Sequence, residues 1–331
     1  MKKKKIKKNL IILGILILIL LGVVISLILI HQPKEEPVSL TEEQKLIEQG
    51  IQIVNKENFT SEANTLLEKG YSADEINQIY EYMSDKNIAK ILTNNKVDLS
   101  KFYQISNFDF DKIDRYLAYQ TSQGIEMKQA VTEVNLNLDT DFYTNIETIE
   151  DPSSITVLVN KFHALPADYV PEDLVSIPSF PNLQIKDDAV DDFENLLAAA
   201  KLDNVIIIPY STYRSYDYQE GLYNKYLQTD SQEEVDTYSA RPGHSEHQTG
   251  LALDVRSSSH WSNLTDSDYE WMLNNSYKYG FIIRYPKDNS RITGYQEEPW
   301  HLRYIGIEHA TKVHELGITF DEYYDIYLTE H

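Results

Sequence analysis

The pattern of apolar and polar residues divides the chain into stretches of different character. Residues 10–30 are apolar and uncharged, and residues 31–40 carry prolines and charges. From Thr41 to about Leu136 apolar residues recur three and four positions apart, a spacing typical of amphipathic helices. Beyond residue 150, short apolar runs alternate with helical spacings. The pattern therefore predicts an all-helical region followed by an α+β domain.

The same pattern predicts the individual elements of the second half. In a strand, side chains two positions apart share a face. We therefore expect Gly250, Ala252 and Asp254 to point the same way, with the small residues leaving space beside the carboxylate. His301 and Arg303 should likewise share a face. The predicted helices are 187–201, 215–227, 266–273 and 307–316, and the predicted strands are 204–210, 250–255 and 300–305.

The amino terminus has the features of a membrane anchor. A lysine-rich segment, residues 1–9, precedes the apolar stretch 10–30, which as a helix would span roughly 30 Å. The lysines favour the cytoplasmic side, so the rest of the chain would face outward. A cleaved signal peptide is the alternative, but its apolar region would be shorter, and residues 31–34 make a poor cleavage site. We therefore expect a single-pass membrane protein.

Composition narrows the chemistry. The formal net charge is −22, which excludes nucleic acid as a partner because phosphate backbones repel an acidic surface. The sequence contains no cysteine, which excludes disulfides and thiolate metal ligands. Any metal site must therefore use imidazole and carboxylate groups.

Two short segments supply those groups. Residues 245–254 read Ser-Glu-His-Gln-Thr-Gly-Leu-Ala-Leu-Asp, and residues 298–301 read Glu-Pro-Trp-His. A catalytic zinc site takes three protein ligands, leaves a fourth position for water and needs a nearby carboxylate to accept a proton. We interpret His247, Asp254 and His301 as the ligands. Glu298 is the expected base, and Glu297 is its rival.

These segments resemble the zinc signature of the VanY-type D-alanyl-D-alanine carboxypeptidases, bacterial cell-wall metallopeptidases that also include L,D-carboxypeptidases. The resemblance covers roughly residues 153 to 318 and implies a small antiparallel sheet flanked by helices, with one Zn²⁺ per chain in a cleft. Thr212 departs from the family, where glycine is common. Further segments that resemble family landmarks are 158–161, 165–169, 211–219 and 280–286.

The resemblance also implies roles for residues around the metal. Arg214 matches the arginine that stabilises negative charge on the scissile carbonyl, a task that suits a permanently charged guanidinium. A structural salt bridge is the alternative role for this residue. Gln219 and Ser245 match donors to the terminal carboxylate of the substrate, whose capture makes an exopeptidase of the site.

We therefore expect a membrane-anchored zinc D,D-carboxypeptidase that removes the terminal D-alanine from peptidoglycan stem peptides outside the cell. The alternatives are an L,D-carboxypeptidase acting on the tetrapeptide stem, a peptidoglycan endopeptidase and a catalytically silent wall-binding module. The sequence leaves D,D against L,D specificity and the oligomeric state open. The expected organisation is a basic cytoplasmic tail (1–9), a transmembrane anchor (10–30), a linker (31–40), a helical spacer or wall-interaction region (41–150) and the catalytic domain (151–331).

Overall fold

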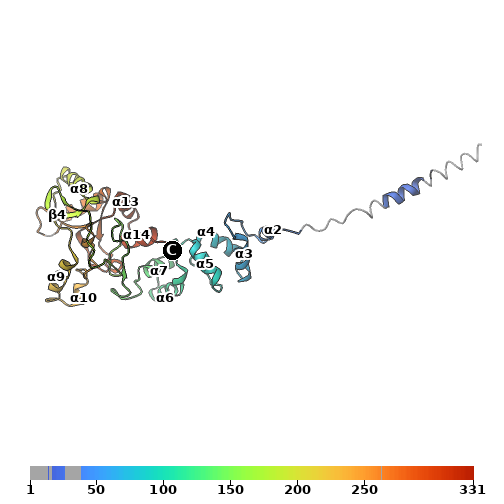
Figure 1. Ribbon diagram of the computed structural model, residues 1–331, viewed down its shortest axis with the longest axis horizontal. Helices are drawn as coiled ribbons and strands as arrows, with labels where there is room; N and C mark the ends of the chain where they lie inside the picture. Colours follow the sequence, from blue (N-terminus) through green and yellow to red (C-terminus); the bar gives the residue numbers. More distant parts are fainter. Residues whose placement is uncertain (1–13, 15–16, 27–38, 262) are drawn as a thin grey trace, which may run out of the picture. The chain divides into compact units, whose positions relative to one another are not determined.

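The structure is a computed structural model that describes residues 14, 17–26, 39–261 and 263–331 (Figure 1). The chain divides into two compact units, residues 1–77 and residues 78–331. The domain limits expected from the sequence stay a prediction.

The membrane-spanning helix predicted at residues 10–30 is contradicted. Of this stretch the structure describes residue 14 and residues 17–26, which are helical. A bilayer span needs about 20 consecutive apolar residues in a helix. Across the described residues, no helix combines that length with sufficient apolar character. The single-pass membrane localisation depended on this helix and is corrected with it. The predicted tail at 1–9 and most of the linker at 31–40 lie outside the described residues.

The first unit consists of short helices with well-defined ends. Thr41 forms a capping box with Gln44 at the start of α2, which satisfies backbone donors that a helix leaves unpaired. Gly70, with φ of 90°, follows α3, and the Ser72 hydroxyl accepts from the backbone N–H of Glu75 ahead of α4. A glycine thus ends one helix and a serine caps the next. The bounds are α2 (Glu42–Glu48), α3 (Phe59–Glu68) and α4 (Ala73–Tyr82), the last of which continues into the second unit.

The second unit begins with helices that contact its carboxyl-terminal part. The buried Asn107 amide donates to Asp325 of α14 (Phe320–Tyr327) at 2.5 Å. Glu133 of α7 accepts from the Arg291 guanidinium at 2.6 Å. These contacts attach the helices to the sheet-containing part of the same unit. The helices are α5 (Asp85–Thr93), η1 (Phe110–Lys112), α6 (Ile113–Gln123) and α7 (Met127–Asn135).

A four-stranded antiparallel sheet with strand order β5-β6-β8-β7 forms the centre of the second unit. The α+β class and the small antiparallel sheet expected from the sequence agree with this architecture. The strands are β5 (Ile207–Ser211), β6 (Ala252–Ser257), β7 (Phe281–Tyr285) and β8 (Glu298–Tyr304). Two further pairs are β1 (Glu147–Thr148) with β2 (His163–Ala164), which is parallel, and β3 (Leu174–Ile177) with β4 (Phe180–Lys186), which is antiparallel.

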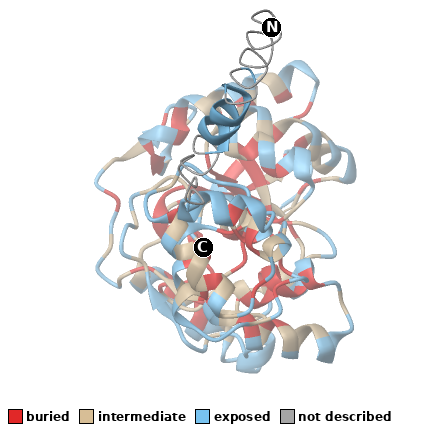
Figure 2. Ribbon diagram, turned by 90° about the vertical axis from the view of Figure 1, so that its right-hand side faces the viewer, coloured by how far each residue is buried: buried red, intermediate tan, exposed pale blue. Residues whose placement is uncertain are grey.

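Helices cover this sheet and supply its core. Phe193 and Leu196 of α8 (Val190–Leu202) pack in one cluster with Leu253 of β6 and Phe281 of β7. Figure 2 shows that the helices and strands carry buried stretches, in red, beside exposed ones, in pale blue. The remaining elements are η2 (Asp187–Ala189), α9 (Tyr216–Tyr226), α10 (Gln232–Val235), η3 (Glu246–Thr249), α11 (Asp266–Asn275), η4 (Ser276–Tyr279), α12 (Ser290–Thr293) and α13 (Ile307–Leu316).

Two details of the predicted strands differ from the structure. Gly250 is not part of β6 but follows η3 with φ of 71°. A Cβ atom there would lie 2.8 Å from Leu174 Cδ2, so the glycine permits a tight turn against β3 and does not leave space beside the Asp254 carboxylate, as was expected. Glu298 does not precede β8 but is its first residue. The strand itself therefore holds both Glu298 and His301.

Candidate active site

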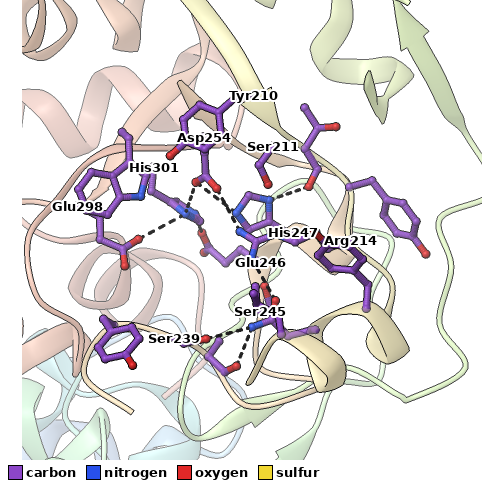
Figure 3. Close-up of a pocket in the computed structure, with 18 of the residues that line it drawn as sticks. Tyr210, Ser211, Arg214, Ser239, Ser245, Glu246, His247, Asp254, Glu298 and His301 are labelled. Carbon is purple, nitrogen blue, oxygen red and sulfur yellow. Dashed lines mark hydrogen bonds and ion pairs between the residues drawn. The ribbon is translucent and has the colours of Figure 1, made fainter. Parts of the chain in front are cut away.

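All seven site residues expected from the sequence line one cavity of about 820 Å³ (Figure 3). They come from separate elements: the segment before α9, α9 itself, the start of η3, and strands β6 and β8. The seven residues are Arg214, Gln219, Ser245, His247, Asp254, Glu298 and His301.

Backbone pairing brings the three expected ligands together. Asp254 of β6 lies directly opposite His301 of β8 in the antiparallel register, and directly opposite residues have neighbouring Cβ atoms. His247 lies on η3, and its backbone carbonyl accepts a hydrogen bond from the Arg214 backbone N–H at 3.2 Å. The turn at Gly250 then leads from η3 into β6.

The ligand atoms of these residues lie within 4.8 Å of one another. Asp254 Oδ1 is 3.3 Å from His247 Nε2 and 3.3 Å from His301 Nδ1. All three side chains are buried. In Figure 3 both imidazoles point toward the Asp254 carboxylate.

A hydrogen bond defines which ring nitrogen of His247 faces the other two expected ligands. The Thr212 carbonyl can only accept, so the His247 Nδ1–H donates to it at 2.7 Å and Nε2 is left with its lone pair. Within the described structure, His247 Nε2 and Asp254 Oδ1 are buried without a hydrogen-bond partner. Two buried acceptors facing each other are unfavourable unless a cation lies between them. The residues therefore fit a metal ion.

The protonation states agree with this fit. Burial, followed by the nearby Arg214, lowers the pKa of His247 to about 4, so its imidazole is neutral and can act as a ligand. Burial alone would lower the pKa of His301, but the adjacent carboxylates of Asp254 and Glu246 outweigh it and raise the pKa to about 9. A cation at this position would displace the proton on Nδ1.

Glu298 lies beside the three expected ligands but is not one of them. Its Oε2 is 3.7 Å from His301 Nδ1, and the residue is 7% exposed. Burial raises the pKa of Glu298 to about 7, and Asp254 contributes in the same direction while His301 opposes it. A carboxylate with a pKa near neutrality can both accept and return a proton.

The buried carboxyl also predicts a dependence of stability on pH. In the metal-free protein the unfolded carboxyl releases its proton near pH 4.5, whereas the folded one keeps it to about pH 7. The stabilisation that the folded wild type gains from the protonated Glu298 carboxyl is therefore lost as pH rises through 7. The loss in the free energy of unfolding is at most about 3 kcal/mol. Thermal unfolding of chelator-treated protein should show Glu298→Gln gaining Tm over wild type increasingly from about pH 5 to pH 8. A Tm difference that does not vary with pH would contradict this.

Arg214, Gln219 and Ser245 form the other side of the site. Arg214 donates from its terminal nitrogens to Asp254 Oδ2 at 3.1 Å and to Gln219 Oε1 at 3.1 Å. The Gln219 amide in turn donates to the Ala240 carbonyl at 2.8 Å, so this side chain is already engaged by the protein. Ser245 lies at the N-cap position of η3 and lines the cavity. The substrate roles expected for Gln219 and Ser245 stay a prediction.

Three buried charged residues, Glu246, Arg284 and Arg303, form a network with His301 that the sequence did not predict. Glu246 Oε2 accepts from the His301 Nε2–H at 3.2 Å. Its Oε1 accepts from Arg284 Nε at 2.7 Å and from an Arg303 terminal nitrogen at 2.9 Å. The sequence offered two clues, since Glu246 adjoins His247 and Arg303 was expected to share a strand face with His301. His301 and Arg303 both contact Glu246, which confirms that they share a face.

Two imidazoles, an ionised carboxylate and a proton-accepting glutamate in one cavity are the requirements of a metal-dependent hydrolase. The sequence comparisons identify the kind of hydrolase. The family model VanY, D-alanyl-D-alanine carboxypeptidase, matches residues 182–307. The Bacillus subtilis protein YodJ is 39% identical over 193 residues, which are 54% of this chain and 70% of YodJ.

Two further comparisons agree. A D-alanyl-D-alanine carboxypeptidase of Enterococcus faecalis is 36% identical over 177 residues, which are 50% of this chain and 64% of the relative. Among solved structures, the LdcB LD-carboxypeptidase matches with a TM-score of 0.51 and 38% identity, covering 55% of this chain and 91% of LdcB. The chain belongs to the VanY family of carboxypeptidases. Its predicted membership and its predicted class, an enzyme of the carboxypeptidase type, are confirmed.

Proposed function

We propose that the protein is a zinc-dependent D,D-carboxypeptidase that removes the terminal D-alanine from peptidoglycan stem peptides. The observation that carries the proposal is the convergence of His247 Nε2, Asp254 Oδ1 and His301 Nδ1 within 4.8 Å of one another. Two imidazoles and a carboxylate with an open side are a donor set that suits catalytic zinc. The described residues contain one such group, so the proposal is one Zn²⁺ per chain.

When bound, the ion would supply Lewis acidity to the scissile carbonyl and lower the pKa of water. The other steps belong to the chain. Glu298 takes a proton from the attacking water, whose oxygen adds to the carbonyl carbon. The same carboxyl then gives that proton to the leaving amine as the carbon–nitrogen bond breaks. The pKa of Glu298, raised by burial to about 7, supports both transfers.

Arg214 would stabilise the negative charge that develops on the carbonyl oxygen. The guanidinium lines the cavity and is held by Asp254 and Gln219, so it needs little reorientation during the reaction. Ser245, with Gln219, would capture the terminal carboxylate of the substrate. Such capture limits cleavage to the last peptide bond.

A second candidate activity is L,D-carboxypeptidase cleavage of the tetrapeptide stem. The likeness to LdcB, 38% identical over 55% of this chain, favours it. The two activities differ in the residue before the scissile bond, which is D-alanine for one and an L-diamino acid for the other.

Defined tetrapeptide and pentapeptide stems, incubated with the protein and analysed by mass spectrometry, test the proposal. We expect loss of one D-alanine from the pentapeptide. Because the ion supplies the Lewis acid, a chelator should reduce the rate by at least about 100-fold, and added zinc should restore it.

The other outcomes have distinct products. Loss of D-alanine from the tetrapeptide alone would favour the L,D-carboxypeptidase. Internal cleavage of a stem or cross-link would identify an endopeptidase. Cleavage that survives the chelator would reject the metal mechanism, and intact peptides with zinc present would indicate a silent binding module.

A further inference from the structure

We infer that Glu246 is the positioning residue that orients His301 toward the metal ion; this inference rests on the zinc site of the proposed function. Glu246 is 1% exposed, and its side chain touches both a proposed ligand and two arginines. It does not belong to the ligand group. Its effect on catalysis would therefore act entirely through His301.

The two histidines present opposite ring nitrogens to the same carboxylate oxygen. His247 uses Nε2, because its Nδ1–H donates to the Thr212 carbonyl. His301 uses Nδ1, because its Nε2–H donates to Glu246 Oε2 at 3.2 Å. A carboxylate can only accept, so Glu246 selects the Nε2–H form of His301. Nδ1 faces Asp254 Oδ1 at 3.3 Å, and loss of its proton leaves a lone pair directed to that side.

Two arginines keep Glu246 ionised and in place. Arg284 Nε and Arg303 both donate to Oε1, at 2.7 and 2.9 Å, which leaves Oε2 for His301. Two guanidinium groups within hydrogen-bond distance of one carboxylate oxygen favour its ionised form. The carboxylate therefore remains an acceptor.

The arginines are themselves anchored at points remote from the metal. Arg284 of β7 donates to Asp321 at the start of α14, at 2.6 Å. Arg303 of β8 donates to the Ile155 and Val157 carbonyls at 3.0 and 2.7 Å. The side chains of Glu246, Arg284 and Arg303 are each 0% exposed.

A buried charge network is a poor source of stability, because desolvation offsets most of the attraction between its members. Its location directly behind one ligand favours a role in orienting that ligand. Carboxylate partners of metal-bound histidines commonly have this role.

The test is the zinc affinity of the full chain, measured by competition with a chromophoric chelator, for wild type, Glu246→Gln and the matched control Asp321→Asn. Both variants replace a buried carboxylate of the same network by an amide, but Asp321 does not contact His301. We expect Glu246→Gln to weaken zinc binding about 10- to 100-fold and to change the visible spectrum of cobalt-substituted protein. Asp321→Asn should stay within about 3-fold of wild type and keep the spectrum, because it leaves every ligand contact intact.

Equal losses in the two variants, or wild-type affinity in Glu246→Gln, would overturn the inference while leaving the proposed function intact. Wild-type protein that binds no zinc would overturn both. Should circular dichroism show Glu246→Gln unfolded, Glu246→Asp takes its place, since it keeps the charge for the arginines but shortens the reach to His301. Wild-type zinc affinity in folded Glu246→Asp would also overturn the inference.

Discussion

Glu298→Gln is expected to lose nearly all turnover and to keep its zinc. The amide occupies the same space beside His301 but cannot take a proton from water, and loss of a general base costs about 10²- to 10⁴-fold in rate. Because Glu298 is not one of the three convergent groups, the zinc content should remain one ion per chain. Steady-state release of D-alanine and metal analysis of the same sample provide both values.

Glu297→Gln is the matched control for this variant. Glu297 is the neighbouring carboxylate and was the rival candidate for the base, but it is absent from the residues that line the cavity. Its substitution should leave turnover within about 3-fold of wild type, as for surface changes away from a reacting centre. Activity of Glu298→Gln above about a tenth of wild type, or greater loss in Glu297→Gln, would contradict the assignment of the base.

Asp254→Asn is expected to lose both zinc and activity. The substitution removes the negative charge that lies between His247, His301 and Arg214, so three groups lose their common partner. Outer partners of metal ligands already contribute about 10- to 100-fold in affinity, and a direct ligand should contribute more. We expect zinc affinity to fall by more than about 100-fold, with turnover falling to that of chelator-treated wild type.

A half-buried carboxylate outside the expected ligand group, Asp236, distinguishes loss of the metal from general loss of stability. Asp236 accepts from Arg241 at 2.7 Å and from the Tyr223 hydroxyl at 2.7 Å, but it is not part of the convergent group. Asp236→Asn should therefore reduce thermal stability and keep zinc. If Asp254→Asn retains wild-type zinc affinity, or Asp236→Asn loses it, the ligand assignment is wrong.

The convergence of the three expected ligands could be anticipated from the sequence because their residue types and spacing suit a metal site. Asp254 and His301 lie on strands that alternate inward and outward positions, and antiparallel pairing makes them direct neighbours. Periodicity alone could not locate the turn at Gly250, which adopts a left-handed conformation outside β6. A glycine expected to leave space beside the Asp254 carboxylate is therefore required by the backbone conformation of the turn.

The network around Glu246 was beyond sequence reasoning for a different reason. Its arginine partners lie 38 and 57 positions away along the chain, and no local pattern specifies which buried arginine meets which carboxylate. At the amino terminus the sequence instead predicted a feature that the structure contradicts. Apolar composition over residues 10–30 predicted a membrane span, whereas no described helix is sufficiently long and apolar.

Anomalous diffraction at the zinc absorption edge, on crystals of the zinc-loaded protein, would locate the ion itself. We expect a single peak within roughly 2.0–2.2 Å of His247 Nε2, Asp254 Oδ1 and His301 Nδ1, with Glu298 outside bonding distance. A peak coordinated by other residues, or crystals without any peak, would contradict the proposed zinc site.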